Sequence, residues 1–419
     1  MDYCIFPPEE MPEGIIDLPL SKSISNRVLI LNALTGNRGR IERTAECDDT
    51  AVMLTALSQT SDEVNIGAAG TAMRFLTAYF AMQPGRTVTI TGTERMCNRP
   101  IALLVDALRQ CGASIEYVDK EGYPPLKIHG CRLAGGDITL PASVSSQYVS
   151  ALLMTAPLME HGLKLTLTDG IVSLPYIKMT LGLMKEWGVD SDFTDNVITV
   201  EPQHYTPVDF KVEADWSAAS YWYEIEALSS GDLSLRGLSS NSLQGDSHVA
   251  DFFTGLGVNS EWDGDVMELM PSPDLTPRIT LDMSEQPDLA QTVVVTCAML
   301  GLPFHITGLS TLKIKETDRL TALRDELRKL SFVIDIVDDN ALEWEGARCP
   351  VDTSLPVVID TYQDHRMAMA FAPVALYIPG LIIRNADVVT KSYPEYWDHL
   401  RSIGFTTKEV DADTLLNNI

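Results

Sequence analysis

The sequence predicts an α/β (α+β) protein of two domains, built from six copies of one helix-and-strand unit with three copies in each domain. Five segments share one order: a leucine-rich amphipathic run, a small residue, then an alternating run typical of a strand. Six further helices of a second kind are apolar on nearly every face. The chain of 419 residues is also too long for one ordinary core.

The five amphipathic segments recur at intervals of roughly 70 residues, a period typical of a repeated structural unit. Each has its small residue at the point where the helix is expected to end: Gly112, Gly188, Gly257, Ser331 and Gly404. A weaker copy, residues 48–64, precedes them and makes six. Each copy predicts an amphipathic helix followed by strands.

The second kind of helix predicts the core, because a helix that is apolar all round is stable only when it is buried. These helices begin at "SKSISNRVLILNAL", "GAAGTAMRFLTAYFA", "SVSSQYVSALLMTAPL", "DWSAASYWYEIEAL", "EQPDLAQTVVVTCAML" and "DHRMAMAFAPVALY". We divide the six units three and three near residue 214. The strand-like residues 3–6 precede the first unit and could belong to either half.

Composition narrows the class of protein. Hydrophobic residues make up 45% and charged residues 21%, as in soluble globular proteins. No apolar run reaches the roughly 18 to 20 residues of a membrane span, and the acidic start differs from a signal peptide, so we expect a cytoplasmic protein. Seven scattered cysteines without a CxxC pair favour reduced thiols, and neither they nor the seven histidines have the spacing of a metal site.

The net charge of −27 argues against a nucleic-acid partner, whose phosphates would be repelled over most of the surface. An anionic small molecule would bind only where the few basic residues cluster. Small or polar residues precede each buried helix, where free backbone N–H groups and the helix dipole favour anions. The sequence therefore predicts an anion site where several of these helix starts converge.

Basic residues lie at several of these helix starts. Lys22, Ser23 and Arg27 fall within two turns of "SKSISNR", and Arg95 and Arg99 precede Pro100 in "TERMCNRPI". Taken singly, each motif can also be a capped helix with ordinary surface charges. Two arginines at the positive end of a helix dipole are nevertheless unfavourable unless an anion joins them.

The second half of the chain repeats this arrangement. The segment "LKIKETDRL" holds Lys315, Glu316 and Arg319 just before a leucine stripe that starts at Leu320. Further charged residues precede two other buried helices or stand near a proline: Asp288 in "SEQPDLAQT", Asp364, His365 and Arg366 in "QDHRMAMAF", and Lys391 in "TKSYPEYW". Such triplets are common on surface helices but rare on buried ones, which favours a functional role.

Together these motifs resemble the 5-enolpyruvylshikimate-3-phosphate synthase (EPSP synthase) family of enolpyruvyl transferases. The resemblance runs in order from residue 21 to residue 394 and rests on eight motifs: "SKSISNR", "GTAMR", "RMCNRPI", "SSQ", "PD", "KETDRL", "DHRMAM" and "TKSYP". Any one of them could arise by chance, whereas eight in order could hardly do so.

The resemblance implies an inverse α/β barrel in each of two domains, with six βαβαββ repeats in all. It places the N-terminal domain at residues 20–214 and the C-terminal domain at residues 1–19 and 215–419, with the active site in the cleft between them. It also implies transfer of the enolpyruvyl group of phosphoenolpyruvate to the 5-hydroxyl of shikimate 3-phosphate, with release of phosphate. We expect closure of the halves on substrate, a monomer, no metal or organic cofactor, no membrane partner, and binding of glyphosate.

The resemblance also implies a role for individual residues. Those expected to hold shikimate 3-phosphate are Lys22, Ser23, Arg27, Ser145, Ser146, Gln147, Ser173, Tyr176, Asp288 and Lys315. Those expected around phosphoenolpyruvate are Lys22, Gly70, Arg95, Gln147, Arg319, His365, Arg366 and Lys391. The residues expected in catalysis are Asp288, Glu316, Lys22, Lys391 and His365. Among these, Asp288 is expected near the 5-hydroxyl and Glu316 near the methylene carbon, with a lysine assisting.

Five positions depart from the family's pattern without removing a charged residue assigned above: Leu20, Ala68, Phe75, Ala214 and Thr311. Three alternatives stay open. The related transferase that acts on UDP-N-acetylglucosamine uses a cysteine five residues before an Arg-Pro pair, whereas Cys97 lies two before Arg99. The other two are a catalytically silent anion-binding relative and RNA 3'-phosphate cyclase, which shares the repeated unit but is disfavoured by the acidic charge.

Overall fold

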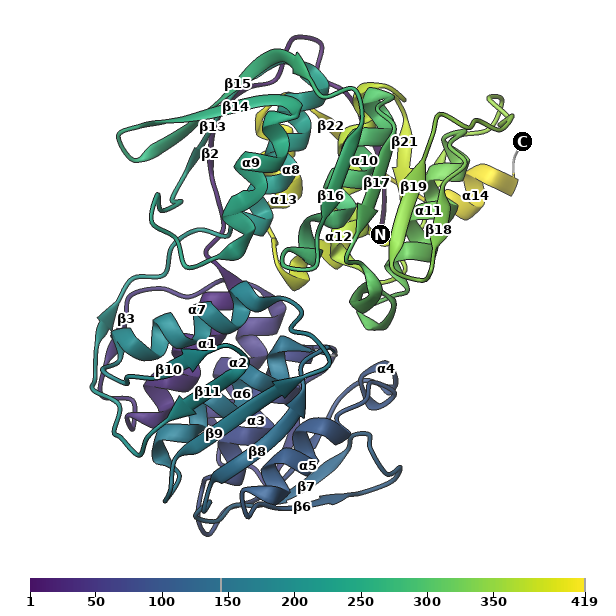
Figure 1. Cartoon of the computed structure of the whole chain (residues 1–419). Helices are drawn as coiled ribbons and strands as arrows, with labels where there is room; N and C mark the ends of the chain where they lie inside the picture. Colours follow the sequence, from purple (N-terminus) through teal and green to yellow (C-terminus); the bar gives the residue numbers. More distant parts are fainter. Residues whose placement is uncertain (144, 418–419) are drawn as a thin grey trace. The chain divides into compact units, whose positions relative to one another are not determined.

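The computed structural model describes residues 1–143 and 145–417 (Figure 1). The chain forms two compact units: unit 1 comprises Met1–Pro19 and Glu213–Ile419, and unit 2 comprises Leu20–Val212. Each unit has a large hydrophobic core of its own. Unit 2 is thus inserted into the chain of unit 1.

Five four-stranded sheets share one topology within the described residues. In each, the first two strands are parallel and the third and fourth follow antiparallel. Unit 2 has two of these sheets. The strands of the first are, in order, β4 (Glu63–Asn65), β5 (Thr87–Thr91), β7 (Leu126–His129) and β6 (Ser114–Tyr117). Those of the second are β8 (Gly136–Pro141), β9 (Leu163–Thr168), β11 (Val197–Val200) and β10 (Asp192–Thr194). In unit 1 they are β2 (Glu13–Asp17), β13 (Asp232–Arg236), β15 (Val266–Leu275), β14 (Leu256–Asp263); β16 (Ile279–Asp282), β17 (Phe304–Thr307), β19 (Ala341–Trp344), β18 (Asp335–Val337); and β20 (Val358–Ile359), β21 (Leu381–Ile383), β1 (Asp2–Phe6), β22 (Thr406–Val410).

The sixth sheet has two strands, β3 (Arg40–Ile41) and β12 (Asp209–Phe210), which pair in parallel. It belongs to the weak copy of the repeat at residues 48–64. The helix of that copy, α2, ends at Ser58, and β4 of the next sheet begins at Glu63. The four residues between them are too few for two further strands, which is why this sheet is short.

The N-terminal strand completes the last repeat of the chain. β1 pairs antiparallel with both β21 and β22, with Tyr3 opposite Ile383 on one side and Glu409 on the other. The strand-like residues 3–6, which the sequence alone could not assign, therefore belong to unit 1.

Both kinds of predicted helix are present. The buried helices are α1 (Lys22–Leu34), α3 (Gly70–Ala81), α6 (Ser146–Thr155), α8 (Trp216–Ser229), α10 (Ala290–Leu300) and α12 (His365–Phe371). The helices between them are α2 (Asp48–Ser58), α5 (Ala102–Gln110), α7 (Leu174–Glu186), α9 (Val249–Thr254), α11 (Arg319–Lys329) and α13 (Tyr396–Ser402). Short helices α4 (Glu94–Cys97) and α14 (Ala412–Asn417) and six 3-10 turns complete the described helical segments.

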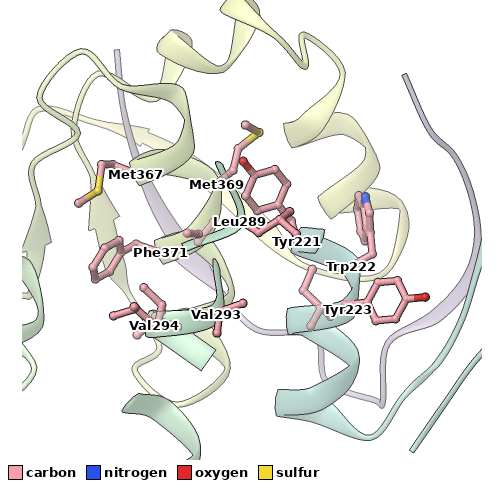
Figure 2. Close-up of a cluster of buried hydrophobic side chains, with 14 of the residues drawn as sticks. Tyr221, Trp222, Tyr223, Leu289, Val293, Val294, Met367, Met369 and Phe371 are labelled. Atoms are coloured by element: carbon pink, nitrogen blue, oxygen red, sulfur yellow. The ribbon is translucent and has the colours of Figure 1, made fainter. Parts of the chain in front are cut away.

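The core of unit 1 shows why its helices must be apolar all round. Figure 2 shows side chains of α8, α10 and α12 meeting in one cluster, among them Tyr221, Val293 and Phe371. All three are 1% exposed or less. The arrangement confirms the predicted fold class. Among the described residues, no helix is long and apolar enough to cross a membrane.

Candidate active site

Arg319, the first residue of α11, holds three carboxylates together in unit 1. Its Nε donates to Oδ2 of Asp364 at 2.7 Å, Nη1 to Oδ1 of Asp288 at 3.0 Å, and Nη2 to Oε2 of Glu316 at 2.9 Å. The side chain is 1% exposed. Burial alone would lower the pKa of Arg319, but the three carboxylates raise it above its usual range, so the guanidinium is permanently charged.

Asp288 lies in a 3-10 turn (Pro287–Leu289) directly before α10 and faces three cations. Besides Arg319, Nη2 of Arg366 donates to its Oδ2 at 3.0 Å, and Nζ of Lys315 lies 3.7 Å from its Oδ1. Burial acts to raise the pKa of Asp288, but Arg366, Lys315 and Arg319 outweigh it and hold the pKa well below its usual range. Asp288 is therefore ionised at neutral pH.

Glu316 lies between two cations. One oxygen accepts from Arg319, and the other accepts from Nζ of Lys391 at 2.8 Å. Lys391 ends a 3-10 turn, Ala386–Lys391, and both of these side chains are mostly buried. A carboxyl between an arginine and a lysine can exchange a proton with the lysine while the arginine fixes its position.

The start of α12 adds a capped turn to the same cluster. Asp364 is the N-cap residue, and its Oδ1 accepts from the backbone N of Arg366 at 3.0 Å. Nδ1 of His365 lies 3.7 Å from the same oxygen, and the histidine is 1% exposed. Asp364 thus joins the helix cap to the ion pair with Arg319.

In unit 2, Arg27 joins α1 to α6 and α7. Its Nε donates to Oγ1 of Thr180 at 2.8 Å, its Nη1 to the carbonyl of Ser23 at 2.8 Å, and its Nη2 to Oγ of Ser150 and the carbonyl of Tyr176 at 3.3 and 3.4 Å. None of these partners is a carboxylate. Burial lowers the pKa of Arg27 to about 10, so it remains a cation at neutral pH.

Lys22, the first residue of α1, has a carboxylate partner from a different helix. Its Nζ lies 3.3 Å from Oδ2 of Asp49, and the two side chains are 15% and 6% exposed. Asp49 lies in the first turn of α2, where the positive end of the helix dipole favours it.

Gly70, at the start of α3, lies against two arginines. A Cβ atom at this position would be 2.6 Å from Nη1 of Arg99 and 3.1 Å from Nη1 of Arg74. Arg74 also donates to the carbonyl of Gly70 at 3.0 Å. Arg95, to which the family resemblance assigned a role in binding phosphoenolpyruvate, lies in the short helix α4 and is exposed. The structure therefore places Arg99 beside Gly70.

The predicted polar residues of unit 2 lie at helix starts. Ser145 is the N-cap of α6, followed by Ser146, and Nε2 of Gln147 donates to Oγ1 of Thr71 on α3 at 3.1 Å. Ser173 precedes α7 with a left-handed backbone, φ 54°. Gln147 thus connects the starts of two buried helices.

The structure brings the predicted residues of unit 1 together, whereas those of unit 2 lie at several helix starts. In unit 1 one connected cluster contains Asp288, Lys315, Glu316, Arg319, His365, Arg366 and Lys391. In unit 2 Arg27 contacts the backbones of Ser23 and Tyr176, whereas Lys22, Gly70 and Gln147 have other partners.

Charged residues that contact the predicted ones but were not assigned from the sequence include Asp49, Arg74, Arg99 and Asp364. Arg99 and Asp364 stand next to assigned motifs, so their positions carried a signal. Asp49 carried none, because an acid in the first turn of a helix is ordinary. Chemically, both sets of residues suit a small ligand with several negative charges.

Comparisons with known proteins agree with this chemistry. A profile of the family described as EPSP synthase (3-phosphoshikimate 1-carboxyvinyltransferase) matches residues 56–400. A 3-phosphoshikimate 1-carboxyvinyltransferase of Bacteroides fragilis is 51% identical over 410 residues, covering 97% of this chain and 99% of the relative. One of Vibrio campbellii is 36% identical, covering 96% and 100%. The solved EPSP synthase of Acinetobacter baumannii is 19% identical and shares the fold, with a TM-score of 0.75 over 97% of this chain and 100% of that one.

Proposed function

The chain belongs to the EPSP synthase family, and on that basis we propose how its own residues carry out the reaction. The enzyme transfers the enolpyruvyl group of phosphoenolpyruvate to shikimate 3-phosphate in the shikimate pathway. Both substrates are anions that repel each other, so the site must supply cations and exclude water. We propose that the clusters of units 1 and 2 serve the same pair of substrates.

We assign shikimate 3-phosphate to a set of residues dominated by hydroxyl and amide groups. Arg27 supports this assignment, because it donates hydrogen bonds to neutral hydroxyl and carbonyl oxygens and keeps its charge for a phosphate. Lys315 and Asp288 extend the set from unit 1, since a sugar hydroxyl needs both a donor and an acceptor. The full set is Lys22, Ser23, Arg27, Ser145, Ser146, Gln147, Ser173, Tyr176, Asp288 and Lys315.

We assign phosphoenolpyruvate to the arginine-rich residues. Arg99 joins this set on geometric grounds, since it lies at the backbone of Gly70, where an anion can approach closely. We leave Arg95 out of this proposed set because its side chain is exposed on α4. The full set is Lys22, Gly70, Arg99, Gln147, Arg319, His365, Arg366 and Lys391.

The chemical step needs one proton removed and one supplied. As the 5-hydroxyl oxygen bonds to C2 of phosphoenolpyruvate, we propose that Asp288 accepts the hydroxyl proton and Glu316 gives a proton to C3. The C2–C3 double bond is thereby consumed and a tetrahedral intermediate forms. In the elimination, the C2–O bond to phosphate breaks, and a proton of the C3 methyl group returns to Glu316, with Lys22, Lys391 and His365 assisting.

Ligand binding would also prepare Asp288 for this role. Burial acts to raise the pKa of Asp288, but Arg366, Lys315 and Arg319 outweigh it and hold the pKa well below the usual range, so Asp288 is a weak base. Anions that share these cations would reduce their pull on Asp288 and raise its proton affinity. The carboxylate would then become a stronger base only when both substrates are present.

The observation that carries the proposal is that one buried guanidinium, Arg319, fixes both Asp288 and Glu316, at 3.0 and 2.9 Å. The test is a phosphate-release assay with phosphoenolpyruvate and either shikimate 3-phosphate or UDP-N-acetylglucosamine. Release with the first acceptor alone is expected. Release only with the second, or with neither, would contradict the assignment.

We further propose a cytoplasmic monomer that closes on its substrates and binds glyphosate in place of phosphoenolpyruvate. Small-angle scattering with shikimate 3-phosphate and glyphosate tests the closure.

A further inference from the structure

The guanidinium of Arg366 contacts Asp288 and Tyr221 through two different nitrogens. Nη2 donates to Oδ2 of Asp288 at 3.0 Å, and Nη1 donates to the phenol oxygen of Tyr221 at 3.4 Å. A guanidinium held at one nitrogen can swing about that bond, whereas a second contact at the other nitrogen fixes its plane. The plane matters because arginine recognises a carboxylate through two parallel N–H groups.

Tyr221 is itself rigidly held. It lies on α8, is 1% exposed, and packs edge-on against Tyr396 with ring centroids 5.9 Å apart. The hydroxyl of Tyr396 donates in turn to the carbonyl of Met369 at 2.9 Å. Figure 2 shows the Tyr221 ring turned toward Met369 on α12, while Tyr223 turns away from it.

A hydrogen bond of Ser217 indicates that the face of α8 that carries Tyr221 is directed toward the Arg366–Asp288 pair. Ser217 lies four residues before Tyr221, and so on the same helical face, and its hydroxyl donates to Oδ2 of Asp246. Asp246 is 3% exposed and interacts electrostatically with Asp288 and Arg366.

The phenol of Tyr221 orients Arg366 without neutralising its charge. Burial raises the pKa of Tyr221 to about 12, with Arg366 opposing the rise, so the group is neutral at pH 7. A further carboxylate in its place would orient the guanidinium but would also neutralise it. A neutral hydroxyl leaves the positive charge of Arg366 to act on a ligand.

We propose that Tyr221 is a positioning residue, which fixes Arg366 in the orientation that binds the carboxylate of phosphoenolpyruvate. The proposal rests on the function proposed above for Arg366. It predicts an effect on phosphoenolpyruvate and none on shikimate 3-phosphate, since the hydroxyl of Tyr221 contacts Arg366, which is assigned to phosphoenolpyruvate alone.

The test compares Tyr221→Phe with Tyr223→Phe. Both remove one oxygen from a buried tyrosine of the same helix, but Tyr223 packs against Phe253, with ring centroids 5.5 Å apart. Because a contact of 3.4 Å is long for a hydrogen bond, we expect Tyr221→Phe to raise the KM for phosphoenolpyruvate about three- to tenfold. Tyr223→Phe should leave it within about twofold, and neither should change the KM for shikimate 3-phosphate.

A double-mutant cycle of Tyr221→Phe with Arg366→Ala separates the proposed role of Tyr221 from the proposed role of Arg366. If Arg366→Ala raises the KM for phosphoenolpyruvate and Tyr221→Phe adds nothing in that background, the positioning role holds. If Arg366→Ala raises the KM but Tyr221→Phe alone does not, only the positioning role is wrong. If Arg366→Ala has no effect, both roles are wrong. An equal rise for both substrates in Tyr221→Phe, with a lowered Tm, would instead indicate a merely structural role.

Discussion

Arg319 and Asp364 form an ion pair that is closed to solvent, with Nε 2.7 Å from Oδ2 and exposed fractions of 1% and 0%. Such a pair adds little net stability while intact, because burying two charges is costly. Removing Asp364 is different, because Arg319 stays buried with only two of its three carboxylates and α12 loses its N-cap. We therefore expect Asp364→Ala to lower the free energy of unfolding by about 3 to 5 kcal/mol.

Asp325→Ala is the matched control for that substitution. Asp325 lies on the same helix as Arg319 and pairs with Arg324, but the two side chains are 44% and 42% exposed. An exposed pair contributes about 0 to 1 kcal/mol, so this variant should unfold close to wild type in urea. Equal losses in the two variants would show that burial of the Arg319–Asp364 pair is not what matters.

The catalytic role of Asp288 and Glu316 should be separable from substrate binding. Asp288→Asn and Glu316→Gln remove a charge and keep the shape, so the cations around them remain available to anions. We expect calorimetry to show binding of both substrates, while turnover falls by about 100-fold or more, the usual contribution of a general acid or base. Asp251→Asn, on an exposed side chain paired with His248, should change neither quantity. Near-normal turnover in either active-site variant would remove that residue from the mechanism.

The segment "LKIKETDRL" shows how far sequence alone reached. The leucine stripe that starts at Leu320 continues through Leu323, Leu327 and Leu330, and all four side chains are buried. The helix α11 begins at Arg319, with Asp318 as its N-cap. Helical periodicity carries this information locally. The prediction that Arg319 belongs with Glu316 also follows from spacing, because residues three apart share a face.

Partners from distant segments could not be predicted in this way. Asp49 and Lys22 are 27 positions apart, and Asp364 and Arg319 are 45 apart, so their contacts depend on how the helices pack. The same reason explains Arg99. The sequence placed both Arg95 and Arg99 ahead of the helix start at Pro100, but it could not show that the turn after α4 brings Arg99 to Gly70. The short sheet of β3 and β12 was missed because its copy of the repeat is weak.

Arg99 and Arg95 make a sharp pair for testing the phosphoenolpyruvate site. Since Arg99 lies against the backbone of Gly70 and Arg95 is exposed on α4, we expect Arg99→Ala to raise the KM for phosphoenolpyruvate by about tenfold or more. Arg95→Ala should change it less than about twofold. Steady-state kinetics with shikimate 3-phosphate held at saturation measures both. The reverse order of effects would restore Arg95 to the site and exclude Arg99.

Glu224, in the middle of α8, should make the protein less stable as pH rises. It is 0% exposed, its two carboxyl oxygens have no hydrogen-bond partner among the described residues, and burial raises its pKa well above the usual range. The folded protein thus retains a proton that the unfolded chain loses above about pH 4.3. The contribution of Glu224 to the free energy of unfolding is therefore greatest below that pH. It falls as the pH rises toward the pKa of Glu224 in the folded protein, by up to about 1.4 kcal/mol per pH unit.

Glu224→Gln, which cannot ionise, should remove this loss while keeping the shape of the side chain. We expect its advantage over wild type in urea unfolding to grow from pH 5 to pH 8. Glu186→Gln, on an exposed position of α7, should follow the wild-type curve throughout. Parallel curves for Glu224→Gln and wild type would mean that Glu224 ionises in the folded protein with the same proton affinity as in the unfolded chain. In that case water or a rearranged partner would have to reach its carboxylate inside the core, because a buried charge without either is far too costly to persist.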